Sequence, residues 1–427
     1  MVRPIALVVL ASADAALRRR VVPIASDGLT VGRVEDEGVN FPIDDKLLSR
    51  RHATIAQLGR GPVQRLTDHQ SRNGSFVDGA RVQKANLHVG AVLRLGISVF
   101  VVDRDDREGL PDVKVGTRDR MLGQSRGFVE IRNRLDELAT KDGPVVLTGE
   151  PGTGKSLAAG HIHREGERSG QLAVVGCRGA GVPLTARDLV GEHDGPAGYF
   201  ASALDGTLVL EEVDLLAPVL QELLADTLSS GTFQPVGSDA KLPFNARVIA
   251  STSASLETAL EAGAFSQRLY DLLGGERIEM TPLRERRVDI PLLAKHFLEL
   301  EEPDRTFDWS PTFLEKLLVH DWPSNSRELR NVMRRLTMVE EDVTTLRSAH
   351  LPKELRTRVH MPSEDALRAS AITVHVAPSR EELKAMLERY EGDVQRVADH
   401  FAKDRRHVYR WLTRHDLSAA DFRKPLE

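Results

Sequence analysis

The stretch GPVVLTGEPGTGKSLAAGHIHRE, residues 143–165, decides the fold of the central part of this chain. An apolar run leads into a glycine-rich turn, and a segment of helical character follows without a break. The turn fits the pattern G-x-x-x-x-G-K-[ST], in the strand-before, helix-after setting that the pattern requires. Its glycines let backbone N–H groups approach phosphate oxygens, and the start of a helix favours the same anions. The stretch therefore predicts a site for nucleotide phosphates.

Every residue of this turn belongs to the predicted phosphate site. Its members are Gly149, Glu150, Pro151, Gly152, Thr153, Gly154, Lys155 and Ser156. Lys155 is expected to reach the β- and γ-phosphates and Ser156 to bind magnesium, so ATP and Mg²⁺ are the expected cofactors.

A second stretch, GTLVLEEVD at 206–214, is an apolar run that ends in two carboxylates. In a nucleotide-hydrolysing fold, such a strand holds magnesium through its first carboxylate and polarises the attacking water through its second. The first is normally aspartate; Glu211 keeps the charge but adds a methylene, which changes its reach to a magnesium-bound water. We therefore predict Ser156 and Glu211 as Mg²⁺ ligands, with Glu211 and Glu212 as catalytic residues.

The bulk composition limits the remaining choices. A chain of 427 residues is too long for one compact core, so several domains are expected. The net charge of −5 excludes a generally basic nucleic-acid coat but allows a local basic element. One cysteine, Cys177, excludes an internal disulfide and favours a cytoplasmic protein. No run has the length of a transmembrane helix, so no membrane partner is expected, and the apolar start is interpreted as a strand rather than a signal peptide.

Changes in pattern predict a multidomain chain. Short Val-, Ile- and Leu-rich runs between turn signals predict an N-terminal β-sandwich, alternating strands and helices predict a central α/β domain, and the C-terminal end is predicted to be all-α. The predicted boundaries are 1–104 for the sandwich, 105–119 for a linker, 120–355 for the α/β domain with a helical lid from about 283, 356–379 for a second linker, and 380–427 for the helical unit.

Three clusters in the sandwich suit the recognition of a phosphorylated peptide. They are GR at 32–33, SRRH at 49–52 and SRNG at 71–74, and they resemble the GR, S-x-x-H and NG pattern of the forkhead-associated (FHA) family. Arginine and hydroxyl groups beside turns can make charge-assisted hydrogen bonds to a phosphate ester. The resemblance implies a phosphothreonine-containing partner, a Ser/Thr kinase or its substrate, with His52 holding the loop together from inside. The implied contact residues are Arg33, Ser49, Arg50, Arg72 and Asn73.

The central domain, from about Leu122 to Leu355, resembles the P-loop AAA+ domain of sigma-54-dependent transcription activators. The likeness includes both stretches above, and the runs PLRERRVDIP at 282–291 and WPSNSREL at 322–329 are specific to that family. By this resemblance Arg327 is the second-sensor arginine, which contacts the ATP phosphates from the lid. RNA polymerase thereby becomes a candidate partner.

The chain departs from that family at positions that matter for activity. The sigma-contacting GAFTGA loop should lie within 191–200, where this chain has only GEHDGPAGYF. Gly176 replaces the asparagine that holds the catalytic glutamate in check, and Ser253 replaces the first-sensor asparagine. Without its contacting loop, the domain is not expected to open a sigma-54 promoter complex.

The arginine-finger segment, FSQRLYDLL at 265–273, also differs. Ser266 and Leu272 occupy the arginine places, and Arg268 is the candidate that could substitute from a shifted position. An arginine finger contributes a factor of about 10³–10⁵ to phosphoryl transfer. We therefore expect ATP binding with slow or absent hydrolysis, and Arg268 is the third candidate catalytic residue.

The C-terminal run at 379–417 resembles a Fis-type helix-turn-helix, with expected helices at 381–390, 394–401 and 404–415. Such a recognition helix needs basic side chains for phosphates and base edges. The expected DNA-binding residues are Arg405, Arg406, His407, Tyr409, Arg410 and Arg414. Because Fis-type units bind as dimers, a homo-oligomer, dimer or higher, is expected.

These observations together predict an ATP-binding, DNA-binding transcription regulator under phosphothreonine control. Two alternatives stay open. One is an ATP-hydrolysing sigma-54-dependent activator with an unusual loop. The other is a nucleotide-bound phosphopeptide scaffold that does not bind DNA.

Overall fold

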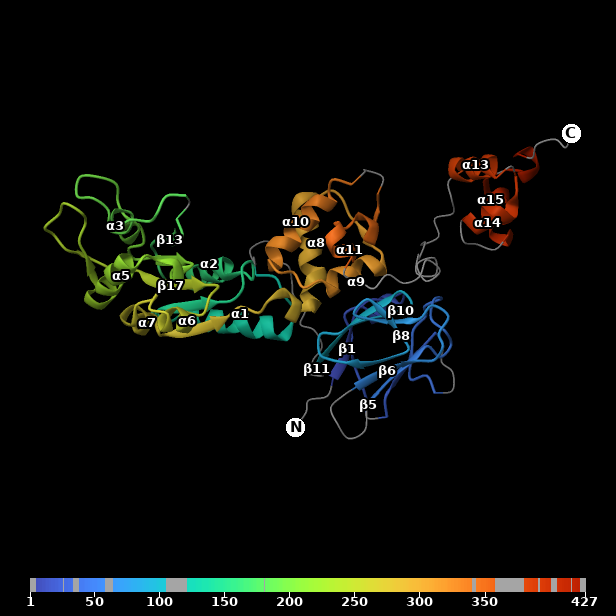
Figure 1. Ribbon diagram of the computed structural model, residues 1–427, viewed down its shortest axis with the longest axis horizontal. Helices are drawn as coiled ribbons and strands as arrows, with labels where there is room; N and C mark the ends of the chain where they lie inside the picture. Colours follow the sequence, from blue (N-terminus) through green and yellow to red (C-terminus); the bar gives the residue numbers. More distant parts are fainter. Residues whose placement is uncertain are drawn as a thin grey trace. The chain divides into compact units, whose positions relative to one another are not determined.

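The computed structural model divides into two compact units, Met1–His360 and Met361–Glu427. The described residues are 5–25, 27–33, 38–57, 64–104, 121–179, 181–339, 343–357, 380–390, 392–400, 405–415 and 417–422. The predicted linker at 105–119, and the second linker from 358 onward, lie outside these ranges. Figure 1 shows the elements of each unit.

The N-terminal region forms the predicted sandwich of two sheets. Its strands are β1 (Ile5–Ala11), β2 (Val21–Pro23), β3 (Leu29–Gly32), β4 (Phe41–Pro42), β5 (Ala53–Gln57), β6 (Gln64–Asp68), β7 (Ser75–Val77), β8 (Ala80–Val82), β9 (Lys84–Leu87), β10 (Val92–Leu95) and β11 (Ser98–Arg104). One sheet has the order β2-β1-β11-β10-β7-β8, and the other has the order β4-β3-β5-β6-β9. The sandwich is visible in blue in Figure 1.

Strand β1 accounts for the apolar start of the chain. It pairs antiparallel with β11 from Ile5 opposite Arg104, which confirms that this segment is a strand. Leu7 and Val9 point into the sandwich core, whereas Val8 belongs to a second core that the sandwich shares with the lid. Successive side chains of a strand alternate between faces, so burial of both faces produces a continuous apolar run.

The central domain is the predicted α/β fold around a parallel sheet. The sheet has the order β13-β14-β17-β12-β18, and every neighbouring pair in it is parallel. The strands are β12 (Val145–Thr148), β13 (Leu172–Gly176), β14 (Thr207–Glu211), β17 (Arg247–Thr252) and β18 (Glu276–Glu279). The helices are α1 (Arg126–Ala139), α2 (Lys155–Glu165), α3 (Ala186–Val190), α4 (Tyr199–Ser202), α5 (Pro218–Ser230), α6 (Leu256–Glu261) and α7 (Gln267–Leu273). Carboxyl ends of parallel strands meet at one edge, so the P-loop after β12 lies beside the carboxylates after β14.

Two small ribbons complete the domain and its lid. They are β15 (Thr232–Phe233) with β16 (Leu242–Pro243), and β19 (Asp308–Trp309) with β20 (Thr345–Leu346). The residues at 191–198 connect α3 to α4 by a tight turn, in which Glu192 N donates to Pro196 O at 3.2 Å.

The lid is helical, as predicted. It contains α8 (Ile290–Glu301), α9 (Pro311–Val319), α10 (Asn325–Leu336) and α11 (Lys353–Thr357). Proline at the first turn starts both α8 and α9, where its missing N–H has no helical partner to lose. Trp322, fully buried before α10, packs in the lid core with Phe313 of α9.

The sandwich packs directly against the lid. Val92, Val99 and Val101 of β10 and β11 belong to the same hydrophobic cluster as the helices of the lid. Within this contact Arg94 Nε donates to Glu315 Oε2 at 2.8 Å, and the two side chains are only 6% and 5% exposed. The charged pair is therefore enclosed by apolar packing.

The C-terminal unit has helices α13 (Arg380–Arg389), α14 (Val394–His400) and α15 (Arg405–His415). Its core includes Leu387, Val397 and Leu412, one from each helix. The bounds agree with the expected helices to within one residue at each end, except that 401–404 lie outside the described residues. Among the described residues of the whole chain, no helix is long and apolar enough to cross a bilayer.

Candidate nucleotide and phosphopeptide sites

The P-loop is held by glycines in left-handed conformations. Gly149, Gly152 and Gly154 have φ of +135°, +77° and +109°, which β-carbon-bearing residues rarely adopt. At Gly152 an added Cβ would lie 2.2 Å from Ser324 O of the lid. Glycine at this position therefore permits both the turn and the close approach of the lid.

Lys155 lies over the loop that precedes it. Its ammonium donates to Gly149 O at 2.5 Å, to Glu150 O at 3.1 Å and to Ser253 Oγ at 2.9 Å. Burial and the nearby Arg327 guanidinium lower the pKa of Lys155, although Glu212 and Glu211 raise it. Ser253, at the first-sensor position, thus lies at the P-loop lysine.

The two predicted magnesium ligands are in direct contact, because Ser156 Oγ donates to Glu211 Oε1. Hydroxyl and carboxylate oxygens are the hard donors that Mg²⁺ prefers. In the described part of the chain, no three His, Cys, Asp or Glu side chains gather around a metal position. A P-loop magnesium ion needs no such cluster, because phosphates and waters complete its octahedron. The residues present therefore fit Mg²⁺ held by Ser156 and Glu211.

Glu212 follows the last residue of β14 in a left-handed conformation, with φ of 55° and ψ of 52°. Its Oε2 accepts a hydrogen bond from Arg178 Nε at 3.0 Å. Arg178 follows β13, the neighbouring strand, and was not among the predicted site residues. The parallel register of Gly176 with Glu211 brings these two strand ends together.

The lid contacts the P-loop through polar side chains of the WPSNSREL run. Asn325 Nδ2 donates to Glu150 Oε2 at 3.1 Å and to Pro151 O at 3.0 Å. Ser326 Oγ donates to Gly152 O, and Cβ of Arg327 lies 3.2 Å from the position of a Cβ on Gly152. The structure therefore places Arg327 beside the P-loop.

The PLRERRVDIP run supplies further contacts that sequence reasoning did not assign. Arg284 donates two hydrogen bonds to the Glu150 carboxylate, at 2.8 and 2.6 Å, and these lower the pKa of Glu150. Arg286 is buried and donates to Thr153 O at 3.2 Å. The runs PLRERRVDIP and WPSNSREL are both specific to the family, and this specificity is the sequence feature that could have pointed to these contacts.

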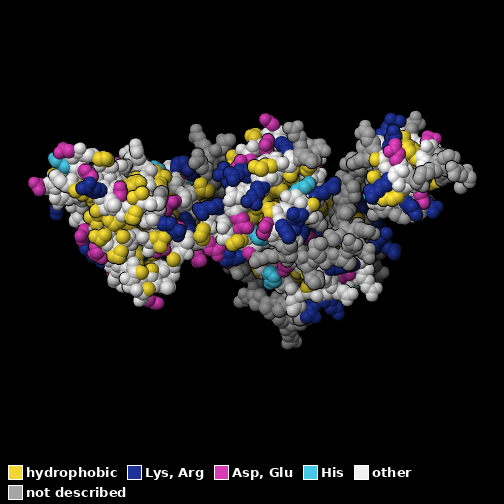
Figure 2. All heavy atoms as spheres, turned by 45° about the horizontal axis from the view of Figure 1, so that its top comes forward, with side chains coloured by type: hydrophobic (Ala, Val, Ile, Leu, Met, Phe, Trp, Pro, Cys, Tyr) yellow, Lys and Arg dark blue, Asp and Glu magenta, His cyan; other side chains and the backbone are white. Residues whose placement is uncertain are grey.

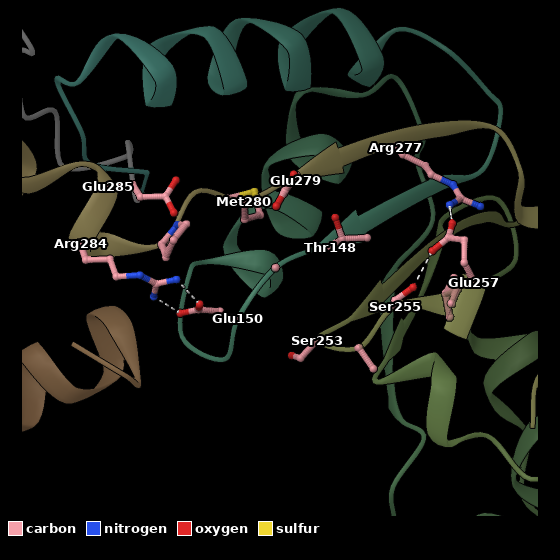
Figure 3. A pocket seen from close by; sticks show the side chains of 14 residues that line it. Thr148, Glu150, Ser253, Ser255, Glu257, Arg277, Glu279, Met280, Arg284 and Glu285 are labelled. Atoms are coloured by element: carbon pink, nitrogen blue, oxygen red, sulfur yellow. Dashed lines mark hydrogen bonds and ion pairs between the residues drawn. The ribbon is translucent and has the colours of Figure 1, made fainter. Parts of the chain in front are cut away.

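A pocket of about 530 Å³ opens beside the start of the P-loop (Figure 3). Figure 3 shows the Arg284–Glu150 pair on one side of it and the Glu257–Arg277 pair on the other, with Ser253 at its edge. Hydrogen bonds from Tyr270, Ser255 and Arg277, besides one within Glu257 itself, lower the pKa of Glu257 to about 2.

Arg268, the candidate for a substitute arginine finger, is held by side chains of the same domain. Its guanidinium donates to Asp226 Oδ1 at 2.6 Å and to Ser229 Oγ at 3.2 Å, and Glu222 lies 3.9 Å away. These partners all lie on α5. The structure does not bring Arg268 into contact with Lys155, Glu211 or Glu212 through any described hydrogen bond.

The phosphopeptide candidates lie on three loops that His52 joins. The buried imidazole accepts from Ser49 N through Nδ1 at 3.2 Å, so Nε2 carries the proton and donates to Gly74 O at 3.3 Å. Ser49 Oγ accepts from Arg72 N at 3.1 Å, and Asn73 Nδ2 donates to Leu47 O at 2.7 Å. The expectation that His52 holds its loop together from inside is therefore confirmed, and the structure adds the contact to the loop at 71–74.

The arginines predicted to bind the phosphate lie on the loops around His52. Arg33 N donates to Ser49 O at 3.0 Å, so the loop after β3 is joined to the same turn. The side chains of Arg33, Arg50 and Arg72 are exposed. Three guanidinium groups at one loop cluster can hold a dianionic phosphate ester.

The predicted DNA-binding residues all lie on α15. Arg405 and Tyr409 are exposed, and Arg405 Nε donates to Gln395 Oε1 of α14. The side chains of Arg406, His407, Arg410 and Arg414 lie outside what the structure describes.

Comparison with known proteins agrees with this architecture. The Sigma-54 interaction domain matches residues 121–279, the AAA+ ATPase lid domain matches 284–367, and the FHA domain matches 29–96. The transcriptional regulatory protein ZraR of Salmonella typhi is 31% identical over 307 residues, which cover 69% of this chain and 68% of ZraR. The Psp operon transcriptional activator of Escherichia coli K12 is 32% identical, over 51% of this chain and 71% of its own length.

Other curated relatives match over a shorter region, and the chain spans about half their length, as in the 52% of ZraR from Salmonella typhimurium. Among solved structures, NtrX from Brucella abortus in complex with ATP is similar, with a TM-score of 0.51 and 26% identity over 70% of this chain and 69% of NtrX.

The fold and the P-loop site define an AAA+ regulator with an FHA domain at its N-terminal end. The chain belongs to the family of sigma-54-dependent transcription activators.

Proposed function

We propose that this protein is an ATP-binding, DNA-binding transcription regulator that responds to a phosphothreonine-containing partner protein, and that it does not remodel sigma-54 polymerase. Its three activities reside in the FHA domain, the AAA+ domain and the C-terminal helices. The last part of the proposal follows from the sequence at 191–200, where GEHDGPAGYF leaves no room for a GAFTGA loop.

The proposal rests on the observation that the lid contacts both the P-loop and the FHA domain. Its helix α10 meets the P-loop through Asn325 and Ser326, and its helix α9 meets the FHA sheet through Glu315. A change at either contact therefore acts on the lid. Regulation by a phosphorylated partner needs such a connection between the reader and the nucleotide site.

The chemistry at the nucleotide site follows from the side chains present. Lys155 and Arg327 supply positive charge for the β- and γ-phosphates, and the loop N–H groups supply further donors. Mg²⁺, held by Ser156 and Glu211, would neutralise charge on the phosphates. Glu212 is the base available to an attacking water, but no described arginine finger accompanies it. We expect ATP binding with little turnover.

ATP binding and turnover should be measured in parallel, by calorimetry and by phosphate release at high protein concentration. Lys155→Ala is the blank for both measurements. Saturable binding that Lys155→Ala abolishes, with slow turnover only slightly above the blank, is the expected result. Turnover that Arg268→Ala abolishes would contradict it.

A specific observation favours a second function, that of an ATP-hydrolysing sigma-54-dependent activator. Lys155, Ser156, Glu211 and Glu212 stand together at one edge of the sheet, as hydrolysis requires. ATP-dependent open-complex formation with purified sigma-54 polymerase would establish this function instead.

Phosphothreonine recognition predicts binding of phosphorylated but not of unphosphorylated peptides. Fluorescence polarisation against a phosphothreonine peptide library would measure this, with Ser49→Ala and Arg33→Ala as the test variants. Arg65→Ala is the matched control, because its guanidinium contacts Asn86 instead. Equal binding of phosphorylated and unphosphorylated peptides would refute the assignment.

DNA binding is proposed for α15 because its sequence, RRHVYRWLTRH, carries four arginines within 405–414. Figure 2 shows Lys and Arg side chains on the visible face of the C-terminal unit. Gel shifts with genomic fragments should detect a complex that Arg406→Ala with Arg410→Ala weakens and that Lys384→Ala, on α13, leaves intact. The absence of any shift, together with phosphopeptide capture, would favour the scaffold alternative.

A further inference from the structure

We propose that Arg178 is a positioning residue that restrains Glu212 in this chain, in place of the asparagine that is missing at Gly176. This inference rests on the proposed ATP binding at the P-loop. It adds a residue to the hydrolytic centre that neither the motifs nor the resemblance assigned.

The first argument is the contact itself. Arg178 Nε donates to Glu212 Oε2 at 3.0 Å, between the ends of neighbouring parallel strands. Glu212 is the carboxylate that must accept a proton from the attacking water. A carboxylate that accepts from a guanidinium is fixed in orientation, so this hydrogen bond holds Glu212 away from an attacking water and opposes its use in catalysis.

The second argument is the space at Gly176. A Cβ built at this position meets nothing within 4 Å, and no left-handed φ is recorded for it. A side chain would fit here, yet the residue is glycine, so this position contributes no group that could hold Glu212. Arg178, two residues further on, reaches the same carboxylate from the same strand end.

The third argument is exposure. The side chain of Arg178 is 72% exposed and that of Glu212 is 40% exposed. Exposed ion pairs contribute little to folding and break easily. Such a contact suits a reversible restraint better than a structural tie, because bound nucleotide or a neighbouring subunit could displace it at small cost.

The charges around Glu212 support a restraint rather than a purely structural pair. The ammonium of Lys155 and the carboxylate of Glu212 also attract one another, because both groups lie at the same edge of the sheet. Glu212 therefore stands between two cations, Lys155 in the site and Arg178 outside it. Removal of Arg178 leaves only the cation inside the site to orient the carboxylate.

The test is single-turnover ATP hydrolysis at saturating ATP and Mg²⁺, with nucleotide affinity measured separately by a fluorescent ATP analogue. We expect Arg178→Ala to raise the hydrolysis rate by roughly fivefold, the factor that an exposed ion pair can supply. The analogue should bind with unchanged affinity. The double variant Arg178→Ala with Glu212→Gln should abolish the gain, which shows that it passes through Glu212.

Two further variants make the result specific. Gly176→Asn in the Arg178→Ala background should return the rate toward that of the wild type, because it restores a polar side chain at the strand end. Arg187→Ala is the matched control, since Arg187 pairs with Glu192 at the same 3.0 Å and with similar exposure. It should leave the rate unchanged.

The outcomes separate this inference from the proposed function. A hydrolysis rate for Arg178→Ala at or below the wild-type rate, with intact analogue binding, overturns the restraint. Absence of saturable analogue binding in the wild type instead overturns the proposed ATP binding.

Discussion

The lid meets two different surfaces, and the two junctions are built differently. Towards the P-loop it uses polar contacts, which include the partly exposed pair of Arg284 with Glu150, each 36% exposed, and the buried side chains of Asn325 and Arg286. Towards the FHA sheet it uses apolar packing around the enclosed Arg94–Glu315 pair. Polar contacts with access to water exchange partners at low cost, whereas a packed core with a buried charge does not.

This difference indicates which junction can move. The FHA sandwich and the lid share one core and should behave as one body, and the exposed polar contacts of the P-loop junction are where that body can shift against the nucleotide. A signal at the FHA loops would then reach the nucleotide site through lid orientation. The predictions below, from the largest expected effect to the smallest, test the two junctions.

Glu315→Ala should have the largest effect on stability. It leaves the Arg94 guanidinium buried without its partner, which costs about 3–5 kcal/mol in the free energy of unfolding. Urea denaturation measures the loss, and Arg94→Met with Glu315→Leu should recover most of it. Arg126→Ala, which breaks an exposed pair with Glu130, is the control and should cost less than about 1 kcal/mol. Equal effects of Glu315→Ala and Arg126→Ala would disprove the fixed junction.

Gly152→Ala should separate the lid from the P-loop. Its φ is +77° and its Cβ would lie 2.2 Å from Ser324 O, so about 1–3 kcal/mol of strain is expected. ATP affinity, measured by calorimetry, should fall by about tenfold or more. Gly127→Ala in α1 is the control, because its Cβ meets nothing within 4 Å and alanine favours a helix. A Gly152→Ala protein with normal ATP affinity would contradict the importance of this contact.

Arg284→Ala should affect nucleotide binding more than stability. The Arg284–Glu150 pair is partly exposed, so its loss should cost less than about 1 kcal/mol in unfolding. Glu150 belongs to the P-loop, and its release should weaken ATP binding by about threefold to fivefold. Arg284→Lys should restore only part of the affinity, because lysine lacks the two-pronged geometry. A stability loss as large as that of Glu315→Ala would show that the two junctions are alike.

Acidification should lower the stability of the FHA domain slightly through His52. Burial lowers the pKa of His52 below its usual 6.5, although Asp68 raises it. Below about pH 6.5 His52 is protonated in the unfolded chain but not in the folded chain. The free energy of unfolding therefore falls as pH falls, by at most about 1.4 kcal/mol per pH unit. His52→Asn should have a shallower loss of melting temperature between about pH 7.5 and 5.5. Half-buried His163, whose pKa is also lowered by burial, contributes to both proteins, so the difference in slope between them isolates His52.

Much of the fold could be predicted from local patterns. The run around Lys155 required a strand, a turn and a helix, because the glycine spacing and the apolar run leave few alternatives. The helical character of the lid followed from periodicity, and the helices of the C-terminal unit followed from the resemblance to a Fis-type helix-turn-helix. The apolar start was predicted as a strand, but the burial of Val8 against the lid was not, because alternation reveals a buried face and not its partner.

The site was predicted only where a motif contains its residues. Lys155, Ser156, Glu211 and Arg327 were found in this way, and the structure brings them together at one sheet edge. Arg178, Arg284 and Asn325 were missed as site residues, because their roles depend on contacts between segments far apart in the sequence.

The sequence by itself determined the architecture and the presence of a phosphate-binding loop, because both depend on local spacing. The tertiary structure alone decided that Arg178 contacts Glu212 and that Arg268 of α7 pairs with side chains of α5. It also decided that one lid joins the P-loop to the FHA sheet. Pairings of this kind depend on strand order and packing. They arise only when the whole chain has folded.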